Sequence, residues 1–349
     1  MANNTNGTSV IAKIPSGVWI SLTALNIFLS IFATLGNVLI LVALRKVSSI
    51  HPPTKLLFRC LAVTDLCVGL ICQPLDVYLT IGNYNKRELV YVYIFFYFVL
   101  FTVSPLTSAA ISVDRLLALL LGLRYKHVVT LRRVRVVRAC VWFIAVSNAS
   151  LWLVNDIQFK YKVLFACSVW TFIALIMVSI IISLFSYIKI FLTLRHQEAQ
   201  LQSHVQPEQS SGRVRSVRNM ARYKKTVYSV AWVQFTMLAC YGPYIVMAFL
   251  WQFGNVGYST EVGVAVRVSR CLFFLNSSLN PFLYCWRIKD VRQQVKNTIR
   301  KCLCCWVNLQ WEKMQQNNGD NWLVTNSAAM LIPLHTTYTD RSHIVHRIS

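Results

Sequence analysis

The sequence contains seven long apolar runs separated by polar breaks, and this pattern limits the fold more than any other feature. The runs cover residues 18–44, 56–81, 90–121, 134–154, 163–194, 226–253 and 262–285. A helix needs about 20 apolar residues to cross the hydrocarbon core of a bilayer. In lipid the backbone polar groups must bond within their own segment, which favours helices. The sequence therefore predicts an all-α membrane protein whose seven-transmembrane helix bundle spans residues 18–285.

Polar segments flank and interrupt this bundle. Residues 1–17 form a polar N-terminus, and residues 195–222 form the one long loop between apolar runs. After the last run, residues 286–305 are basic and amphipathic, which predicts a short helix on the membrane surface. Residues 306–349 are read as a polar cytoplasmic tail.

The distribution of charge predicts the orientation. The net charge is +23, from 35 Lys and Arg against 12 Asp and Glu. Because these bases lie between apolar runs, we expect contact with membrane lipids and no nucleic acid. With the N-terminus outside, only seven of the 35 bases face outward, in agreement with the positive-inside rule. We therefore expect a multi-pass plasma-membrane protein with an extracellular N-terminus, glycosylated at Asn3 and Asn6, and a cytoplasmic C-terminus.

Three of the eleven cysteines stand apart from the rest. Most of the others are single residues within apolar runs, where a thiol packs as a small apolar group. Cys302, Cys304 and Cys305 instead end the amphipathic segment beside the membrane. Such cysteines are frequent acylation sites, so palmitoylation is predicted there, with inert thiols as the alternative.

One acid lies in the middle of an apolar run. Asp65 is costly in a membrane and therefore needs partners. Asn37, Asn276, Ser277 and Asn280 are the polar residues of other runs that could supply them. Such an oxygen-rich group could hold a hard cation with water, or it could be a hydrogen-bonded contact between helices. The residues alone leave both readings open, and no other metal or cofactor is indicated.

Short motifs at matching depths then identify a family. They are Gly36-Asn37, Leu61-Ala62 with Asp65, Asp114-Arg115-Leu116, Trp142, Pro243 and Asn280-Pro281-Phe282-Leu283-Tyr284. In this order they resemble the motifs of rhodopsin-like (class A) G-protein-coupled receptors, over residues 18 to about 305. The resemblance implies a heterotrimeric G protein as partner.

The resemblance also implies roles for individual residues. Asp114 matches the acid that restrains Arg115, and Arg115 matches the residue that contacts the G protein after activation. Tyr187 and Tyr284, with Asn280 and Pro281, match the remaining switch positions. The family's sodium pocket, which would hold Na⁺ as an allosteric ion, maps onto the set Asn37, Asp65, Ser104, Asn276, Ser277 and Asn280.

Several positions depart from the family pattern. Val90 stands where the family's disulfide cysteine is usual, so no disulfide is expected. Ser179 replaces the usual proline of the fifth span, and Tyr241 replaces the usual tryptophan of the sixth. Pro105 and Met237 occupy the other positions that couple the pocket to the cytoplasm. The short second extracellular loop (residues 155–162), the missing disulfide and the missing proline of the fifth span are similar to the melanocortin, cannabinoid, lysophospholipid and adenosine receptor group, although Asn280 differs from the Asp of melanocortin receptors.

Ligand classes can be weighed by the same comparison. Tyr97 occupies the position of the acid that binds biogenic amines, which leaves Asp76 as the remaining counter-ion for an amine. Phe274 occupies the position of the retinal-binding lysine, which excludes an opsin. The candidate lining residues are Gln73, Asp76, Tyr97, Phe101, Tyr241, Tyr244, Trp251 and Phe274. Such an aromatic pocket suits a lipid, a nucleoside or a small peptide, although each residue could equally pack between helices.

The predicted function is that of a receptor which passes the binding of an extracellular ligand to G proteins. No enzyme motif is present, so an enzyme is not expected. The alternatives are a seven-span transporter or channel, or a receptor-like protein that does not couple.

Two features of the cytoplasmic side bear on regulation. Tyr223 stands where many family members place an acid that restrains Arg115, which predicts signalling without ligand. A phosphorylation cluster for arrestin is predicted at Thr336, Thr337 and Thr339, with an unmodified tail as the alternative.

Overall fold

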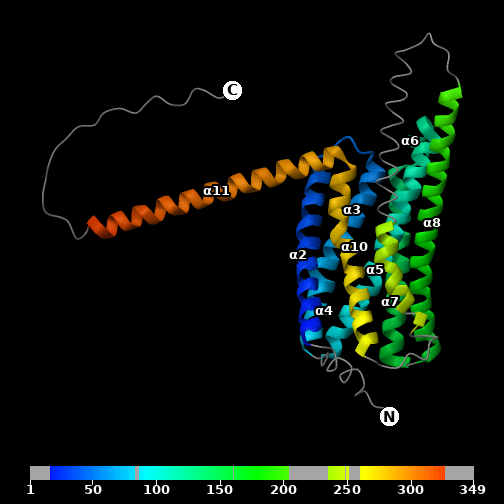
Figure 1. The fold of residues 1–349 in the computed structure, drawn as a ribbon, viewed down its shortest axis with the longest axis horizontal. Coiled ribbons are helices and arrows are strands. Elements are labelled where there is room, and N and C mark those ends of the chain that lie inside the picture. Colours follow the sequence, from blue (N-terminus) through cyan, green and yellow to red (C-terminus); the bar gives the residue numbers. More distant parts are fainter. Residues whose placement is uncertain are drawn as a thin grey trace, which may run out of the picture. The chain divides into compact units, whose positions relative to one another are not determined.

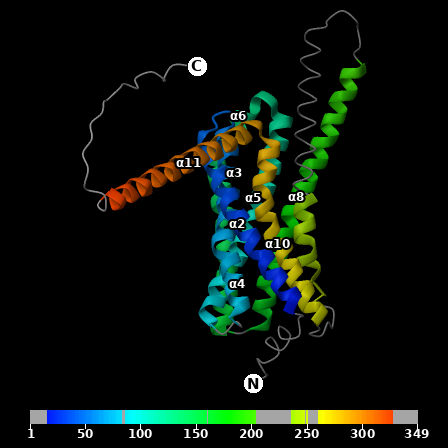
Figure 2. The same cartoon turned by 60° about the vertical axis from the view of Figure 1, so that its left-hand side comes forward.

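The computed structural model describes residues 16–82, 86–159, 161–203, 235–247, 249–250 and 260–326. The chain divides into two units, Met1–Thr298 and Ile299–Ser349. Every regular element in the described ranges is a helix. The helices of the first unit pack side by side as a bundle (Figures 1 and 2). The all-α prediction is confirmed.

Long helices correspond to the apolar runs. Six of them are long and apolar enough to cross a membrane, and the helix Phe235–Met247 is shorter because the sixth run is described only in part. The elements are α2 (Ser16–Lys46), α3 (Pro52–Cys67), η1 (Val68–Cys72), α4 (Gln73–Ile81), α5 (Arg87–Leu121), η2 (Gly122–Arg124), α6 (Tyr125–Val128), α7 (Leu131–Val154), η3 (Asn155–Phe159), α8 (Lys162–Ser203), α10 (Thr260–Arg287) and α11 (Lys289–Asn326).

A π-helical turn interrupts the second span. Pro74 has no amide hydrogen, and its ring would clash with the carbonyl group four residues earlier in a regular helix. The chain avoids this clash in η1, where the Gln73 amide donates to the Val68 carbonyl. The extra residue rotates α4 relative to α3. As a result, Gln73 and Asp76 both reach Asn26 on α2.

Glycines allow α2 to pack closely against two neighbours. A Cβ atom on Gly36 would lie 2.7 Å from Cγ of Pro281 on α10. A Cβ atom on Gly69 would lie 2.7 Å from the Thr34 hydroxyl, and the Gly69 carbonyl accepts a hydrogen bond from Ser30 at 2.7 Å. Small residues at such crossings are typical of membrane helices, because they let backbones approach one another.

The interior of the bundle alternates between apolar and polar layers. One buried apolar cluster includes Tyr97, Phe101 and Phe273, and a second includes Ile40, Phe58 and Tyr284. On α3, α5 and α10 the polar residues around Asp65 fall between the two clusters in sequence. The outer surface is also apolar, as shown by the exposed fractions of Phe143 (74%), Leu35 (61%) and Ile181 (58%). Such a surface suits a lipid environment.

Two helices run further than the sequence predicted. α8 continues to Ser203, nine residues beyond its apolar run, and α11 continues to Asn326 instead of ending at residue 305. Neither extension contains proline, so nothing in the local sequence forces the helix to stop.

Candidate functional site

One polar cluster, which we call the Arg115 cluster, consists of Thr54, Asp114, Arg115 and Tyr125. Arg115 pairs with the neighbouring Asp114, with Nη2 at 2.5 Å and Nε at 3.1 Å from Oδ2. The Thr54 hydroxyl donates to the same carboxylate oxygen at 2.9 Å and accepts from Arg115 Nη2 at 2.8 Å. The Tyr125 hydroxyl donates to Asp114 Oδ1 at 2.6 Å. The carboxylate is therefore held by three residues, and Asp114 is only 4% exposed.

Local backbone features bring these residues together. Pro53 lies in the first turn of α3, where a proline is preorganised for the helix, and Thr54 follows directly. Gly122 ends α5 with a φ of 50°, a conformation that side-chain-bearing residues rarely adopt. The resulting turn returns Tyr125 on α6 to the carboxylate of Asp114.

The tyrosines Tyr187 and Tyr284 lie in different clusters. The Tyr187 hydroxyl accepts a hydrogen bond from Ser112 on α5 at 2.8 Å. Tyr284 packs in the second apolar cluster, with its ring edge against Phe58 at a centroid distance of 5.2 Å. The structure therefore does not bring the two tyrosines into a common group.

The Asp65 cluster occupies the middle of the bundle. Asp65 is fully buried, and Asn280 Nδ2 donates to its Oδ2 at 2.6 Å. The buried hydroxyls of Ser104 and Ser277 lie beside the same carboxylate. Asp65 Oδ1, by contrast, accepts no hydrogen bond from the described residues. The Asp65 carboxylate is therefore surrounded by polar side chains of α5 and α10.

The two remaining asparagines of the predicted pocket make other contacts. Asn37 Nδ2 donates to the carbonyl oxygens of Ala33 and Ser277, at 2.8 and 3.2 Å. Its Oδ1 is buried and accepts no hydrogen bond from the described residues. Asn276 Nδ2 donates to the Tyr241 hydroxyl at 3.3 Å. In this conformation, Asn276 is therefore engaged with the sixth span instead of with Asp65.

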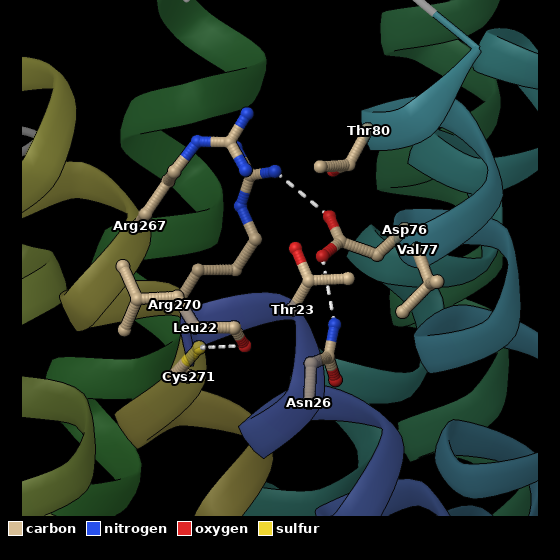
Figure 3. Close-up of a pocket in the computed structure, with 9 residues that line it drawn as sticks. All are labelled: Leu22, Thr23, Asn26, Asp76, Val77, Thr80, Arg267, Arg270 and Cys271. Atoms are coloured by element: carbon tan, nitrogen blue, oxygen red, sulfur yellow. Dashed lines mark hydrogen bonds and ion pairs between the residues drawn. The ribbon is translucent and has the colours of Figure 1, made fainter. Parts of the chain in front are cut away.

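Another polar group, the Asp76 cluster, ties α2, α4, α5 and α10 together, and Figure 3 shows its members Asn26, Asp76 and Arg270 on α2, α4 and α10. Asp76 is 7% exposed. Its Oδ1 accepts from Arg270 Nη1 at 2.8 Å and from the Tyr93 hydroxyl at 3.0 Å, and its Oδ2 accepts from Asn26 Nδ2 at 2.9 Å. Gln73 extends the network, because its Nε2 donates to Asn26 Oδ1 at 3.0 Å. A buried acid of the second span is therefore paired with a base of the seventh.

The aromatic residues predicted to line a ligand pocket pack against one another. Tyr97, Phe101, Tyr241 and Phe274 are all buried. The Phe273 ring lies at their centre, with centroid distances of 4.3 Å to Phe101, 4.4 Å to Tyr241 and 5.7 Å to Tyr97. The Tyr244 ring is 4.9 Å from Phe273. In this conformation these rings belong to the first buried apolar cluster or pack against it, and their contact with a ligand stays a prediction.

Some predicted sites lie elsewhere. Cys302, Cys304 and Cys305 are exposed on α11, and all eleven cysteines of the chain are free thiols. Other predicted residues lie outside the described ranges: Asn3, Asn6, Tyr223, Trp251, Thr336, Thr337 and Thr339.

Sequence reasoning missed several residues that complete these clusters. Thr54, Tyr125, Asn26 and Tyr93 carry no charge and match no motif, so no sequence signal indicated them. Arg270 could have been found, because charges within membrane spans usually pair with one another, and Asp76 lies in the outer half of the second apolar run.

Comparisons with known proteins agree with this architecture. Rat melanocortin receptor 5 is 25% identical over 300 residues, which cover 80% of this chain and 85% of that receptor. Bovine adenosine receptor A2b is 25% identical over 317 residues, covering 81% and 90%. The crystal structure of squid rhodopsin superposes with a TM-score of 0.68 at 19% identity, covering 84% of this chain and 88% of that one.

The family assignment comes from a match over most of the bundle. Residues 36–284 match the family described as 7 transmembrane receptor (rhodopsin family). The match begins at Gly36, where α2 packs against Pro281, and ends at Tyr284. The chain belongs to the rhodopsin family of seven-transmembrane receptors, and it is a G-protein-coupled receptor and not an enzyme.

Proposed function

We propose that this receptor binds an extracellular ligand near the Asp76 cluster and engages a heterotrimeric G protein at the Arg115 cluster. This assignment places the N-terminus outside and the C-terminus in the cytoplasm. The excess of Lys and Arg in the segments assigned to the cytoplasmic side supports that orientation. The plasma membrane would therefore separate the two clusters.

The contact geometry of the Arg115 cluster is the observation that carries this proposal. Arg115 is held by Asp114 and Thr54, and Asp114 is held in turn by Tyr125. A side chain held by charge-assisted hydrogen bonds can act as a switch, provided that a second state offers it other partners. A G protein docked at this end would supply those partners. The separation of Tyr187 from Tyr284 fits the restrained state.

We further propose that Na⁺ stabilises this restrained state at the Asp65 cluster. The residues suit a hard cation, because one carboxylate oxygen of Asp65 and the amide oxygen of Asn37 are buried and accept no hydrogen bond from the described part of the chain. The hydroxyls of Ser104 and Ser277 would add neutral oxygen ligands. A bound cation would tie α3, α5 and α10 together, and its loss would favour their rearrangement.

The proposed modification sites agree with the same membrane orientation. Cys302, Cys304 and Cys305 are exposed, as palmitoylation requires. Asn3 and Asn6 would carry the extracellular glycans, and phosphorylation of the tail would recruit arrestin. Tyr223 stands where many family members have a second acid that restrains Arg115. Without that acid, Arg115 is held mainly by the Arg115 cluster, which supports measurable signalling without ligand.

A panel of G proteins in cells tests the proposed function. Energy transfer between dissociating subunits is measured for the wild type and for Arg115→Ala, at matched surface expression. We expect basal dissociation of at least one G-protein class in the wild type and its loss in the variant. Dissociation that is equal in the two would overturn the role of Arg115. A lack of coupling to every class would favour a receptor-like protein that does not couple.

A further inference from the structure

The Asp76 carboxylate is already satisfied within the protein. Both of its oxygens accept hydrogen bonds, and its charge is paired with the Arg270 guanidinium at 2.8 Å. A cationic ligand would therefore have to displace Arg270 before Asp76 could serve as its counter-ion. This geometry argues against an amine ligand, for which the sequence had left Asp76 as the remaining counter-ion.

Arg267 adds a second positive charge to the same cavity. It lies one helical turn before Arg270 on α10, and both arginines line the cavity with Asp76 (Figure 3). Arg267 is partly buried, and within the described part of the chain it forms no hydrogen bond or ion pair. The walls of the cavity therefore carry two guanidinium groups against a single carboxylate.

The chemistry of these two groups selects an anion. Removing a cation from water is costly unless a partner of opposite charge compensates for it. The planar guanidinium group presents a fork of donors that matches a carboxylate or a phosphate. We propose that the ligand of this receptor carries a carboxylate or phosphate group, and that this group binds between Arg267 and Arg270. The inference rests on the proposed function, since it concerns the ligand end of the same receptor.

The size of the cavity indicates how the anion would enter. The space is about 20 Å³, enough for one or two water molecules. An anionic group therefore fits only when Arg270 turns away from Asp76 toward the ligand. Binding would thus replace the ion pair that joins α4 to α10 by a pair between α10 and the ligand.

This exchange gives the ligand a route to the rest of the bundle. Arg270 lies on the same helix as Asn280, which bonds to Asp65, and as Tyr284. Releasing α10 from Asp76 would remove one restraint on the helix that carries both residues. A ligand can shift a two-state equilibrium only through contacts that differ between the states, and the Asp76–Arg270 pair is such a contact.

Binding is tested on the full-length purified receptor in phosphatidylcholine nanodiscs. Four probes of similar size are compared by thermal shift: phenyl phosphate, benzoate, benzylamine and benzyl alcohol. We expect at least one of the two anions to stabilise the wild type, and the amine and the alcohol to have no effect. The comparison between phenyl phosphate and benzoate shows which anion the site prefers.

Variants then assign the effect to the cavity. Arg267→Gln should weaken anion binding roughly 10- to 100-fold, as expected for the loss of charged hydrogen bonds. Asp76→Asn should strengthen it, because Arg270 loses its competing carboxylate. Arg87→Gln, an arginine that does not line the cavity, is the matched control and should bind as the wild type does. The melting temperature of each variant without probe checks its folding.

Three results would overturn the proposal: stabilisation by benzylamine or benzyl alcohol that matches the anions, no binding of either anion, or weaker anion binding by Asp76→Asn. No G protein is present in this assay. Its failure would leave the Arg115→Ala comparison intact, so the two proposals fail separately.

Discussion

Removing the hydroxyl of Tyr125 should raise signalling without ligand. Its bond to Asp114 Oδ1 measures 2.6 Å, and the acceptor is a carboxylate. A hydrogen bond to a charged group contributes about 1.5–3 kcal/mol. If this bond exists only in the restrained state, Tyr125→Phe multiplies the ratio of active to restrained receptor by roughly 10 to 150. Starting from about 1% active receptor, the active fraction would rise to between about 10% and 60%.

The lower end of this range is the expected result. Tyr125 lies beside the exposed residues Arg124 and Lys126, where water can partly replace the lost bond. Basal G-protein dissociation is measured at matched surface expression, with Tyr78→Phe as the control. Tyr78 is 48% exposed on α4, which does not contribute to the Arg115 cluster, so its variant should signal as the wild type does. The same reasoning predicts a rise for Thr54→Val, which removes bonds to both Asp114 and Arg115.

Basal signalling that stays at the wild-type level in both Tyr125→Phe and Thr54→Val would refute this reasoning. A fall in signalling would also refute it, since that result would mean that these hydroxyls support the active state.

Three further predictions concern other parts of the chain. Replacing N-methylglucamine by Na⁺ should raise the melting temperature of the purified wild type but not of Asp65→Asn; an equal response in both would exclude Asp65 as a ligand. Gly36→Ala should destabilise the protein by about 1–3 kcal/mol, because the added Cβ would lie 2.7 Å from Pro281. Gly17→Ala is the control: its added Cβ would have no atom within 4 Å, so the melting temperature of this variant should equal that of the wild type. Replacing the three α11 cysteines Cys302, Cys304 and Cys305 by serine should abolish palmitate labelling. Label that is retained would place the lipid on other residues.

The fold was predictable because the bilayer imposes a length and a polarity on every span. The apolar runs predicted the long helices, and the polar breaks predicted where most of them end. The π-helical turn before Pro74 was not predicted, since proline in a membrane helix can be accommodated in more than one way. The extensions of α8 to Ser203 and of α11 to Asn326 were not predicted. A helix is recognised in a sequence mainly by the periodic spacing of its apolar residues, and these polar segments lack that spacing.

The candidate site was predictable where a residue has a costly charge or stands in a motif. Asp65, Asp114 and Arg115 were found for this reason. Thr54 and Tyr125 were not, because their roles arise only from the turn at Gly122 and the start of α3. The aromatic residues were found as a set, although sequence alone could not separate a pocket from core packing around Phe273.

Nucleotide exchange on purified components tests the central claim most directly. The full-length receptor is reconstituted in phospholipid vesicles with heterotrimeric G proteins, and GDP–GTP exchange is followed for the wild type, Tyr125→Phe and Arg115→Ala. The account predicts that the wild type accelerates exchange on at least one class of G protein, that Tyr125→Phe accelerates it further, and that Arg115→Ala does not accelerate it. Acceleration by Arg115→Ala equal to that of the wild type would contradict the claim that Arg115, released from Asp114, is the group that engages the G protein.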